Sequence, residues 1–272
     1  MIFLFFSCSQ FSKDPDQIQD IALGNANTCI LIAGEIHCWG GNLSGESQPP
    51  QGDFIGLTLG AYHGCAWTQY GNVSCWGNNS SQQLEPPSGP MLHVSCGGNQ
   101  CCGITPSQEV RCWGFNLQGT PPRSAQEVHV GSSHACALHF DGSITCWGND
   151  FDGLLVPPAG SFGALAAGDF HNCAWNSGEQ ARCWGSNLYG QTTPPSSETD
   201  MIALGSFHSC LIDVDNAGYC FGWNDQDQLT LPVEEWKILS LGGQHSCGLS
   251  QQEELLCWGQ NSAGQTVVPD EF

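Results

Sequence analysis

Short apolar segments separated by turn-forming residues recur along the chain. From residue 164 the chain reads Ala-Leu-Ala-Ala-Gly-Asp-Phe-His-Asn-Cys-Ala-Trp, and after a turn it continues Arg-Cys-Trp-Gly. Each apolar segment is about five residues long, the usual length of a strand in a globular sheet. The 35 glycines indicate many tight turns. This pattern predicts an all-β chain in which each unit supplies three short antiparallel strands.

The same unit returns along the whole chain. The tripeptide Cys-Trp-Gly starts at residues 38, 75, 112, 146, 183 and 257, and Cys-Phe-Gly starts at residue 220. Three short strands cannot bury both faces of a sheet alone, whereas units stacked around an axis bury one another. A linear solenoid would need atypical capping units, but the first and last units resemble the middle ones. Residues 17–272 are therefore predicted to form a seven-bladed β-propeller, preceded by a tail or signal remnant of residues 1–16.

Two cysteines in each unit have the spacing of a disulfide across a hairpin. In the fourth unit a three-residue loop, 140–142, places Cys136 opposite Cys146, and a loop one residue shorter places Cys29 opposite Cys38. Directly opposed antiparallel residues have Cα atoms about 4.5–5.5 Å apart, a separation that a disulfide spans. Metal binding would need convergent clusters such as Cys-x-x-Cys, and none recurs. The predicted pairs are Cys29–Cys38, Cys65–Cys75, Cys102–Cys112, Cys136–Cys146, Cys173–Cys183, Cys210–Cys220 and Cys247–Cys257.

Three further cysteines fall outside this scheme. Cys96 and Cys101 lie on either side of Gly97 and are candidates for a local eighth bridge. Cys8 follows a short apolar run that resembles the end of a secretory signal, so it is a candidate for lipid attachment, against the alternative of a frayed terminus. No apolar run reaches the length of a membrane span. With 17 cysteines, the chain is expected outside the cell or at its surface, and in the periplasm or outer membrane if the source is bacterial.

The charge balance is strongly acidic and limits the classes of partner. The chain has 26 acidic and 5 basic residues, a formal net charge of −21. Nucleic acids and anionic membranes require a face rich in lysine and arginine, so neither is expected as a partner. No motif of a serine hydrolase, phosphate-binding loop or zinc peptidase is present. We therefore expect no catalytic residue and no cofactor, and a monomer that binds a protein or a glycan.

The repeat pattern Gly-x-x-His-x-Cys-Ala-Leu, Asp-Gly, Cys-Trp-Gly-x-Asn-x-x-Gly-Gln resembles the repeats of the regulator of chromosome condensation (RCC1-like) family. The resemblance covers all seven units and implies a seven-bladed propeller. The short, cysteine-bearing units are similar to the ectodomains of plant Crinkly-type receptor kinases. Residues 190–194, Gly-Gln-Thr-Thr-Pro, are similar to repeats of the secreted bacterial propeller that inhibits β-lactamases.

This chain departs from each of these relatives. It has no transmembrane helix or kinase domain, and it has hairpin cysteines that the inhibitor does not share. It also lacks a long insertion of the kind that would carry guanine-nucleotide exchange. The resemblance to the inhibitor implies binding through loops on one face of the propeller.

Turn positions that vary between units are candidates for binding. The two residues between the turn glycine and the histidine vary, and so does the turn after Cys-Trp-Gly. Aromatic rings there suit binding hot spots because they offer large contact area with few rotatable bonds, although they would also suit packing against a neighbouring loop. The predicted partner-binding residues are Tyr62, Asn99, Asp169, Phe170, Phe207 and Gln244 in the first turn, and Phe151 and Tyr189 in the second.

Two groups of residues have both a metal-binding and a structural interpretation. Five histidines share one repeat position, but Asn27 and Gln100 replace them in two units, which favours hydrogen bonding over metal binding. The acidic turns 150–153 and 225–227 resemble calcium loops but lack the full series of ligands, so solvated turn acids are favoured. No metal site is predicted. The histidines are His63, His134, His171, His208 and His245.

The leading functional prediction is a secreted or surface-anchored, non-catalytic binding module. It would recognise a protein or glycan through the loops of one propeller face. Two alternatives stay open: a regulator of a small GTPase with nucleotide-exchange activity, which the family resemblance implies, and a hydrolase with an active site in the channel.

Overall fold

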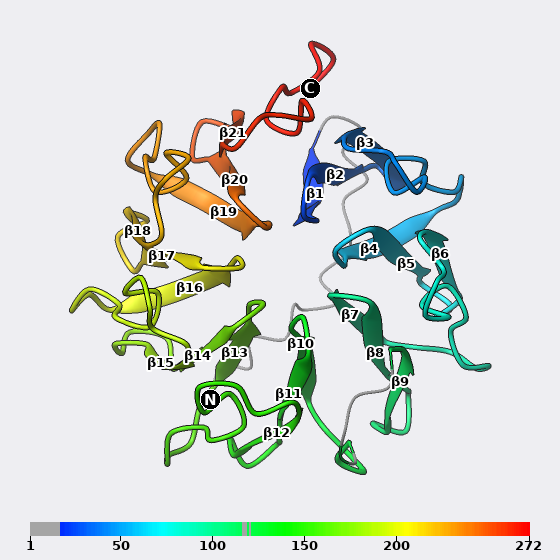
Figure 1. The fold of residues 1–272 in the computed structure, drawn as a ribbon, viewed down its shortest axis with the longest axis horizontal. Helices are drawn as coiled ribbons and strands as arrows, with labels where there is room; N and C mark the ends of the chain where they lie inside the picture. The colour runs from blue at the N-terminus through cyan, green and yellow to red at the C-terminus, as the bar shows by residue number, and fades with distance from the viewer. Residues whose placement is uncertain (1–16, 116–118, 120) are drawn as a thin grey trace.

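The computed structural model describes residues 17–115, 119 and 121–272, so the predicted tail and Cys8 lie outside the described residues. The described strands form seven separate three-stranded sheets arranged radially around a central axis (Figure 1). Within each sheet three consecutive strands pair in chain order and antiparallel. No helix among the described residues has the length and hydrophobicity needed to cross a membrane. The predicted all-β, seven-bladed propeller is confirmed.

The blades are numbered along the chain, and the first strand of each blade lies innermost (Figure 1). Blade 1 contains β1 (Ile18–Leu23), β2 (Asn27–Ile32) and β3 (Glu35–Gly40); blade 2 contains β4 (Phe54–Leu59), β5 (His63–Thr68) and β6 (Val73–Gly77); blade 3 contains β7 (His93–Gly97), β8 (Gln100–Ile104) and β9 (Val110–Gly114); blade 4 contains β10 (Glu127–Val130), β11 (His134–Leu138) and β12 (Ile144–Gly148); blade 5 contains β13 (Ala164–Ala167), β14 (His171–Trp175) and β15 (Arg182–Gly185); blade 6 contains β16 (Thr199–Leu204), β17 (His208–Asp213) and β18 (Gly218–Gly222); blade 7 contains β19 (Trp236–Leu241), β20 (His245–Ser250) and β21 (Leu255–Gly259).

Hairpin register follows the spacing of the cysteines. In blade 4 the Gly142 amide donates to the His139 carbonyl at 2.9 Å, and Cys136 pairs directly with Cys146. In blade 1 Ala33 and Gly34 both have positive φ, as a tight two-residue hairpin turn requires. All seven predicted hairpin disulfides are present, with Cα–Cα distances of 4.0–4.1 Å.

An eighth disulfide joins Cys96 to Cys101 in blade 3. These residues are directly paired on β7 and β8, so the bridge ties the inner strand to the middle strand. The Cys102–Cys112 bridge ties the middle strand to the outer one. Both hairpins of blade 3 are therefore cross-linked.

The hydrophobic core is divided into seven clusters, and each cluster lies between two neighbouring blades. Leu31 of blade 1 packs in one cluster with Leu57 of blade 2. Ile30 of blade 1 packs in another with Leu249 of blade 7, which closes the ring. Each sheet thus buries both of its faces against its neighbours, as the short strands require.

The turn glycines set how closely the blades approach one another at the axis. A Cβ atom on Gly168 would lie 2.4 Å from the carbonyl oxygen of Gly205 in the next blade. A Cβ atom on Gly242 would lie 2.4 Å from the carbonyl oxygen of Gly24, across the junction of the last and first blades. The recurring glycine is therefore a consequence of backbone contact between blades.

Within the described residues, the ring closes without exchange of strands between blades 7 and 1. The Trp39 indole donates from Nε1 to the Gln265 carbonyl at 3.0 Å. Phe272 stacks on Trp39 with ring centroids 6.3 Å apart and also contacts His37. Closure therefore rests on side-chain packing and hydrogen bonds between two blades.

Candidate binding face

Two sets of turns meet at one end of the propeller. The turn between the first and second strands of each blade is bonded to the loop that follows the third strand. In blade 5 the Ser186 amide donates to the Phe170 carbonyl, and in blade 6 the Trp223 amide donates to the Phe207 carbonyl, both at 2.9 Å. We call this end the loop face. The turns between second and third strands form the opposite end, the hairpin face.

The recurring histidines form a relay of contacts between neighbouring blades. Each Nε2 atom lies 2.7–3.1 Å from the side chain that follows the equivalent position in the next blade. These side chains therefore have the expected structural role, which is hydrogen bonding between neighbouring blades. The pairs are His63–Cys101, His134–Asn172, His171–Ser209, His208–Ser246 and His245–Thr28.

Two blades lack the histidine, and the reason lies in the blade that follows. The position that Asn27 faces is Gly64, and the position that Gln100 faces is Ala135, so neither neighbour offers a polar side chain. Asn27 donates instead to the Glu46 carbonyl at 3.1 Å, and Gln100 donates to the Gly131 carbonyl at 3.0 Å. Histidine thus occurs where the next blade offers a side chain that can bond to it, and an amide side chain occurs where the next blade has glycine or alanine.

Burial keeps the relay histidines neutral. Loss of solvent lowers the pKa of His63 and His245 to about 4 and that of His171 and His208 to about 3. The pKa of His134 is lowered by the same cause, and its hydrogen bond with Asn172 opposes the shift. A neutral imidazole between two blades donates or accepts a hydrogen bond without burying a charge.

Only one group of three potential metal ligands is found in the described part of the chain: His63, Cys96 and Cys101. Cys96 and Cys101 are joined in a disulfide, so their sulfur atoms are not available as thiolate ligands. The acidic turns 150–153 and 225–227 form no such group. These two turns instead present exposed carboxylates on the loop face.

Five aromatic rings from blades 4, 5 and 6 gather on the loop face. Phe170 and Phe207 stack with centroids 4.8 Å apart and an interplanar angle of 14°. Phe151 meets the edge of Phe170 at 6.5 Å, and Tyr189 meets Phe207 at 5.6 Å. Trp223 contacts both Tyr189 and Phe207. We call these five residues the aromatic patch.

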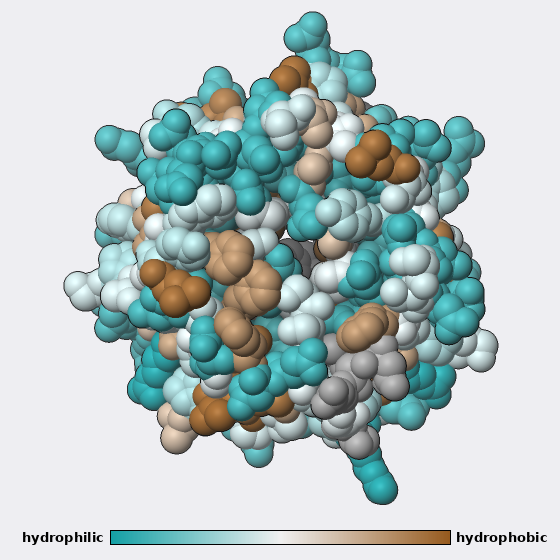
Figure 2. Space-filling view, in the orientation of Figure 1, coloured by the Kyte–Doolittle hydropathy of each residue, from teal (hydrophilic) through white to brown (hydrophobic). Residues whose placement is uncertain are grey.

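The patch is accessible to a partner. Phe151 is 53% exposed and Tyr189 is 49% exposed, while the two stacked rings and Trp223 are half-buried. Figure 2 shows hydrophobic side chains gathered on one side of the central opening, over the blades of β13 to β17, on a face that is mostly hydrophilic. Four of these rings, those of Phe151, Phe170, Tyr189 and Phe207, were predicted as separate partner-binding residues, and in the structure they lie together.

Trp223 is the one patch residue that was not predicted from the sequence. It follows Cys220-Phe221-Gly222 directly, at a position held by Gly41, Asn78 and Asn149 in other blades. The residue at that position varies between blades, as do the residues of the predicted binding turns. The signal was therefore present in the repeat, two residues before the position of Phe151.

Tyr62, Asn99 and Gln244 lie in the equivalent turns of blades 2, 3 and 7. Tyr62 is 44% exposed and Asn99 is exposed, whereas Gln244 is half-buried. Among the described residues, no ring contact joins Tyr62 to the aromatic patch. These three residues share the loop face with the patch but belong to other sectors of the ring.

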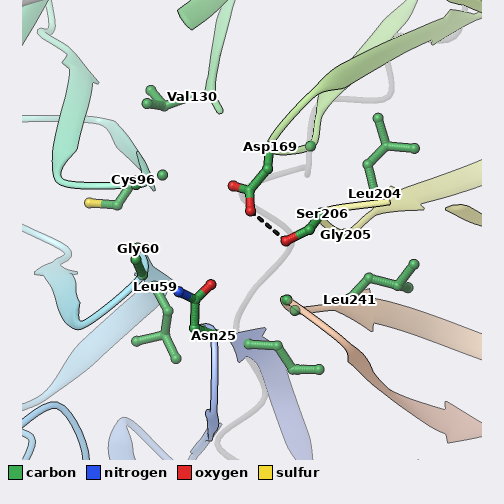
Figure 3. A pocket seen from close by; sticks show the side chains of 18 of the residues that line it. Asn25, Leu59, Gly60, Cys96, Val130, Asp169, Leu204, Gly205, Ser206 and Leu241 are labelled. Atoms are coloured by element: carbon green, nitrogen blue, oxygen red, sulfur yellow. Dashed lines mark hydrogen bonds between the residues drawn. The ribbon is translucent and has the colours of Figure 1, made fainter. Parts of the chain in front are cut away.

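Asp169 occupies the inner border of the patch, at the central cavity. The cavity has a volume of about 120 Å³, and its wall is mostly glycine backbone and aliphatic side chains such as Leu204 and Leu241. The Ser206 hydroxyl donates to the Asp169 carboxylate at 2.5 Å, and Asn25 points into the cavity from the opposite side (Figure 3). Burial raises the pKa of Asp169, and the hydrogen bond from Ser206 opposes this shift.

Exposed carboxylates surround the outer border of the patch. Asp150 and Asp152 flank Phe151, while Asp225 and Asp227 follow Trp223 in the same loop, and all four are exposed. The basic side chains with described polar contacts are engaged elsewhere. Arg111 on β9 pairs with Glu109, Lys237 on β19 pairs with Glu253, and Arg182 on β15 donates to the Ala159 carbonyl.

These features define the class of protein: a closed seven-bladed β-propeller of disulfide-clasped repeats with a variable loop face. Three of its units match the family model described as regulator of chromosome condensation (RCC1) repeat, over residues 127–153, 164–191 and 236–265. These three units therefore match RCC1 repeats, and the resemblance to RCC1-like repeats seen in the sequence is confirmed. A comparison with curated protein sequences gives no match.

Solved structures with the same fold include two plant receptor ectodomains. The entire ectodomain of the Physcomitrella patens receptor kinase CR4 superposes with a TM-score of 0.78 and 25% identity, over 89% of this chain and 74% of that one. The CRINKLY WD40 ectodomain of the Arabidopsis thaliana receptor kinase ACR4 gives 0.75 and 26%, over 91% and 97%. Prp20p of Saccharomyces cerevisiae, described with its binding to Gsp1p and histones, gives 0.72 and 15%, over 92% and 84%, and shows the fold alone.

Proposed function

We propose that this propeller is a non-catalytic binding module, secreted or held at the cell surface, that recognises a protein through the aromatic patch. The observation that carries the proposal is the assembly of five rings from three consecutive blades at variable turn positions. An apolar patch with a polar surround on an otherwise hydrophilic face is characteristic of a protein-binding site.

The environment of the patch favours recognition over reaction. Of the residues that line the central cavity, Asp169 is the one with an ionisable carboxylate, and none is a histidine, lysine or arginine. A hydrolase in the channel would need a second acid or base beside it. The rings themselves supply contact area and no reactive group.

The location outside the cell is supported by the cysteines and by the structural relatives. Eight disulfides in a chain of this size are typical of an oxidising compartment. Two of the related structures are receptor ectodomains. Prp20p, another propeller of this fold, is described as binding the proteins Gsp1p and histones. Attachment of a lipid to Cys8 remains a prediction.

A face-resolved cross-linking experiment tests the proposal. A photoreactive phenylalanine analogue is placed at Phe151 on the loop face, and in a matched variant at Phe140, which is 57% exposed on the hairpin face. Each purified protein is applied to the surface of cells from the native source and irradiated. We expect one cross-linked protein from position 151, suppressed by an excess of unlabelled wild-type chain, and none from position 140.

The captured protein is then used to measure affinity. Replacement of Phe170, Tyr189 and Phe207 by Ala is expected to weaken its binding by about 100-fold or more, because central aromatic contacts dominate binding energy. Tyr70→Ala removes an exposed ring from the hairpin face and should leave affinity unchanged. Equal affinity of the triple variant and the wild type would refute the patch as the binding site, and a cross-linked glycan in place of a protein would refute the partner class.

A further inference from the structure

Asp169 is a recessed carboxylate without a cationic partner in the described part of the chain. Its described polar contacts are the hydroxyl of Ser206 and main-chain bonds, including one from its own amide to the Gly205 carbonyl. The ion pairs of the described residues all lie elsewhere. A carboxylate held in this way has lost solvent without gaining an opposite charge.

The aromatic stack begins immediately outside this carboxylate. Asp169 precedes Phe170 in one turn and Ser206 precedes Phe207 in the next, so the hydrogen-bonded pair and the stacked pair are consecutive layers of the same two turns. Asp169 faces the central cavity (Figure 3). Because the stacked rings are the next residues of the same two turns, a side chain that packs on them from the loop face lies beside this carboxylate.

An aromatic stack followed by a carboxylate fits a long side chain that ends in a positive charge. The apolar stem of arginine or lysine packs well on aromatic rings, and its charged end is attracted to ring faces and to carboxylates. The exposed carboxylates Asp150, Asp152, Asp225 and Asp227 surround the same patch. The overall net charge of −21 would also steer a cationic partner toward the protein.

We propose that the partner inserts a basic side chain across the Phe170–Phe207 stack to pair with Asp169 at the mouth of the central cavity. This inference rests on the proposed function and specifies the chemistry of its partner: a basic loop or terminus of a protein. The stack holds the stem, Asp169 neutralises the head group, and the outer carboxylates attract the surrounding basic residues.

A pair of isosteric small molecules tests the charge requirement directly. Butylguanidinium carries the stem and head group of an arginine side chain, and butylurea has nearly the same shape without the charge. Dissociation constants are measured by ligand-observed NMR with the full chain at low salt. We expect butylguanidinium to bind about tenfold more tightly than butylurea.

Two matched variants assign that difference to a position. Asp169→Asn retains an acceptor for the Ser206 hydroxyl and removes the charge, so the preference for butylguanidinium should fall below about twofold. Asp215→Asn makes the same change at an exposed position of the β17–β18 turn on the hairpin face and should retain the preference. Equal binding of the two probes to the wild type, or an unchanged preference in Asp169→Asn, would overturn the proposal.

The captured partner separates failure of this inference from failure of the proposed function. With a basic side chain inserted, Asp169→Asn weakens partner binding by at least about tenfold and reduces its dependence on salt. If Asp169→Asn leaves affinity and salt dependence unchanged while the triple Ala variant loses binding, the patch is the site but the basic side chain is not. If the triple variant also binds normally, the proposed function itself is wrong.

Discussion

On the loop face, blades 4 to 6 bring five aromatic rings into mutual contact, whereas blades 1 to 3 present Leu43, Tyr62 and Phe115 as separate exposed side chains. Beneath both sectors the same scaffold recurs: a hairpin disulfide in each blade, a turn glycine and an apolar cluster between neighbours. The repeat therefore determines the framework, and departures from it at a few turn positions distinguish one sector from another.

The two sectors also differ in the interfaces beneath their surfaces. Histidine relays join blades 4 to 5, 5 to 6, 6 to 7 and 7 to 1, as well as 2 to 3. The junctions of blades 1 with 2 and 3 with 4 have an amide donating to a main-chain carbonyl instead. Acid should therefore affect the junctions unequally.

Acidification gives the largest expected effect. The folded-state pKa values of the relay histidines lie well below the ordinary 6.5, so the unfolded chain takes up protons that the folded chain does not. Stability is full above pH 6.5 and declines as pH falls toward these folded values. At pH 5.5 each histidine lowers the free energy of unfolding by roughly 1.4 kcal/mol, or several kcal/mol in all. Urea denaturation at pH 7.5 and 5.5 measures this loss.

Hydrogen exchange at pH 5.5 would locate the acid effect. Amides at the histidine junctions of blades 4 to 7 should lose protection before those at the two amide junctions. Uniform protection around the ring, or stability that does not change between the two pH values, would contradict the account of the relay.

The second prediction compares one ring from each sector. Phe207→Ala removes the ring that contacts Phe170, Tyr189 and Trp223, and should weaken partner binding by about 30-fold, or roughly 2 kcal/mol. Tyr62→Ala removes an isolated ring and should change affinity by less than about threefold. Both are measured by surface plasmon resonance with the captured partner. A comparable loss from Tyr62→Ala would extend the binding surface into blade 2.

The third prediction converts a histidine pair, His171 with Ser209, into a glutamine pair of the kind formed at Gln100. Ser209→Ala leaves the His171 Nε2 atom without its partner and should lower the free energy of unfolding by about 1–2 kcal/mol. Adding His171→Gln recreates the combination of Gln100 and Ala135, and should restore at least half of the loss through a bond to the Gly205 carbonyl. As a control, His171→Gln should not rescue Ser246→Ala. If the effects of His171→Gln and Ser209→Ala on the free energy of unfolding simply add in the double variant, the two positions are not matched as partners.

The smallest effect is expected for the stability of Asp169→Asn. Burial raises the folded-state pKa of Asp169, so its ionised form is disfavoured at neutral pH and the neutral amide should stabilise the chain slightly. The gain in the free energy of unfolding should be small, and it should vanish at pH values below the unfolded pKa of 3.8, where the acid is protonated in both states. Thermal unfolding of both proteins at pH 7 measures it. A loss of stability would indicate that Asp169 serves the scaffold rather than binding.

The framework could be predicted from the sequence because it depends on local spacing. Counting outward from a two- or three-residue turn fixes which residues face each other, and this gave the pairing of Cys29 with Cys38 and of Cys136 with Cys146. The short strands and the unit repeated seven times required mutual burial, which gave the ring. None of these steps depends on how side chains are oriented in three dimensions.

The binding face was predictable only in part because it depends on which turns become neighbours. Phe151 and Phe207 are far apart in the chain and meet through Phe170, and no spacing rule reveals that contact. The relay could have been predicted from the sequence: in four of the five pairs the residue facing the histidine lies 38 positions further on, for example His171 and Ser209. The pattern within one repeat does not reveal this match, because the two partners belong to successive repeats.

The junction of blades 7 and 1 is mechanically distinct from the other six because it is closed by side-chain packing and a few hydrogen bonds, including one from the Gly243 amide to the Gly24 carbonyl at 3.2 Å. A continuous chain segment crosses each junction from blade 1 to blade 7, while blades 7 and 1 meet through contacts such as those of Phe272 with Trp39 and Thr28 with His245. When tension is applied to the two ends of the chain, the junction of blades 7 and 1 bears the load through non-covalent contacts alone. Blades 7 and 1 would then separate first, while each blade stays cross-linked by its own disulfide.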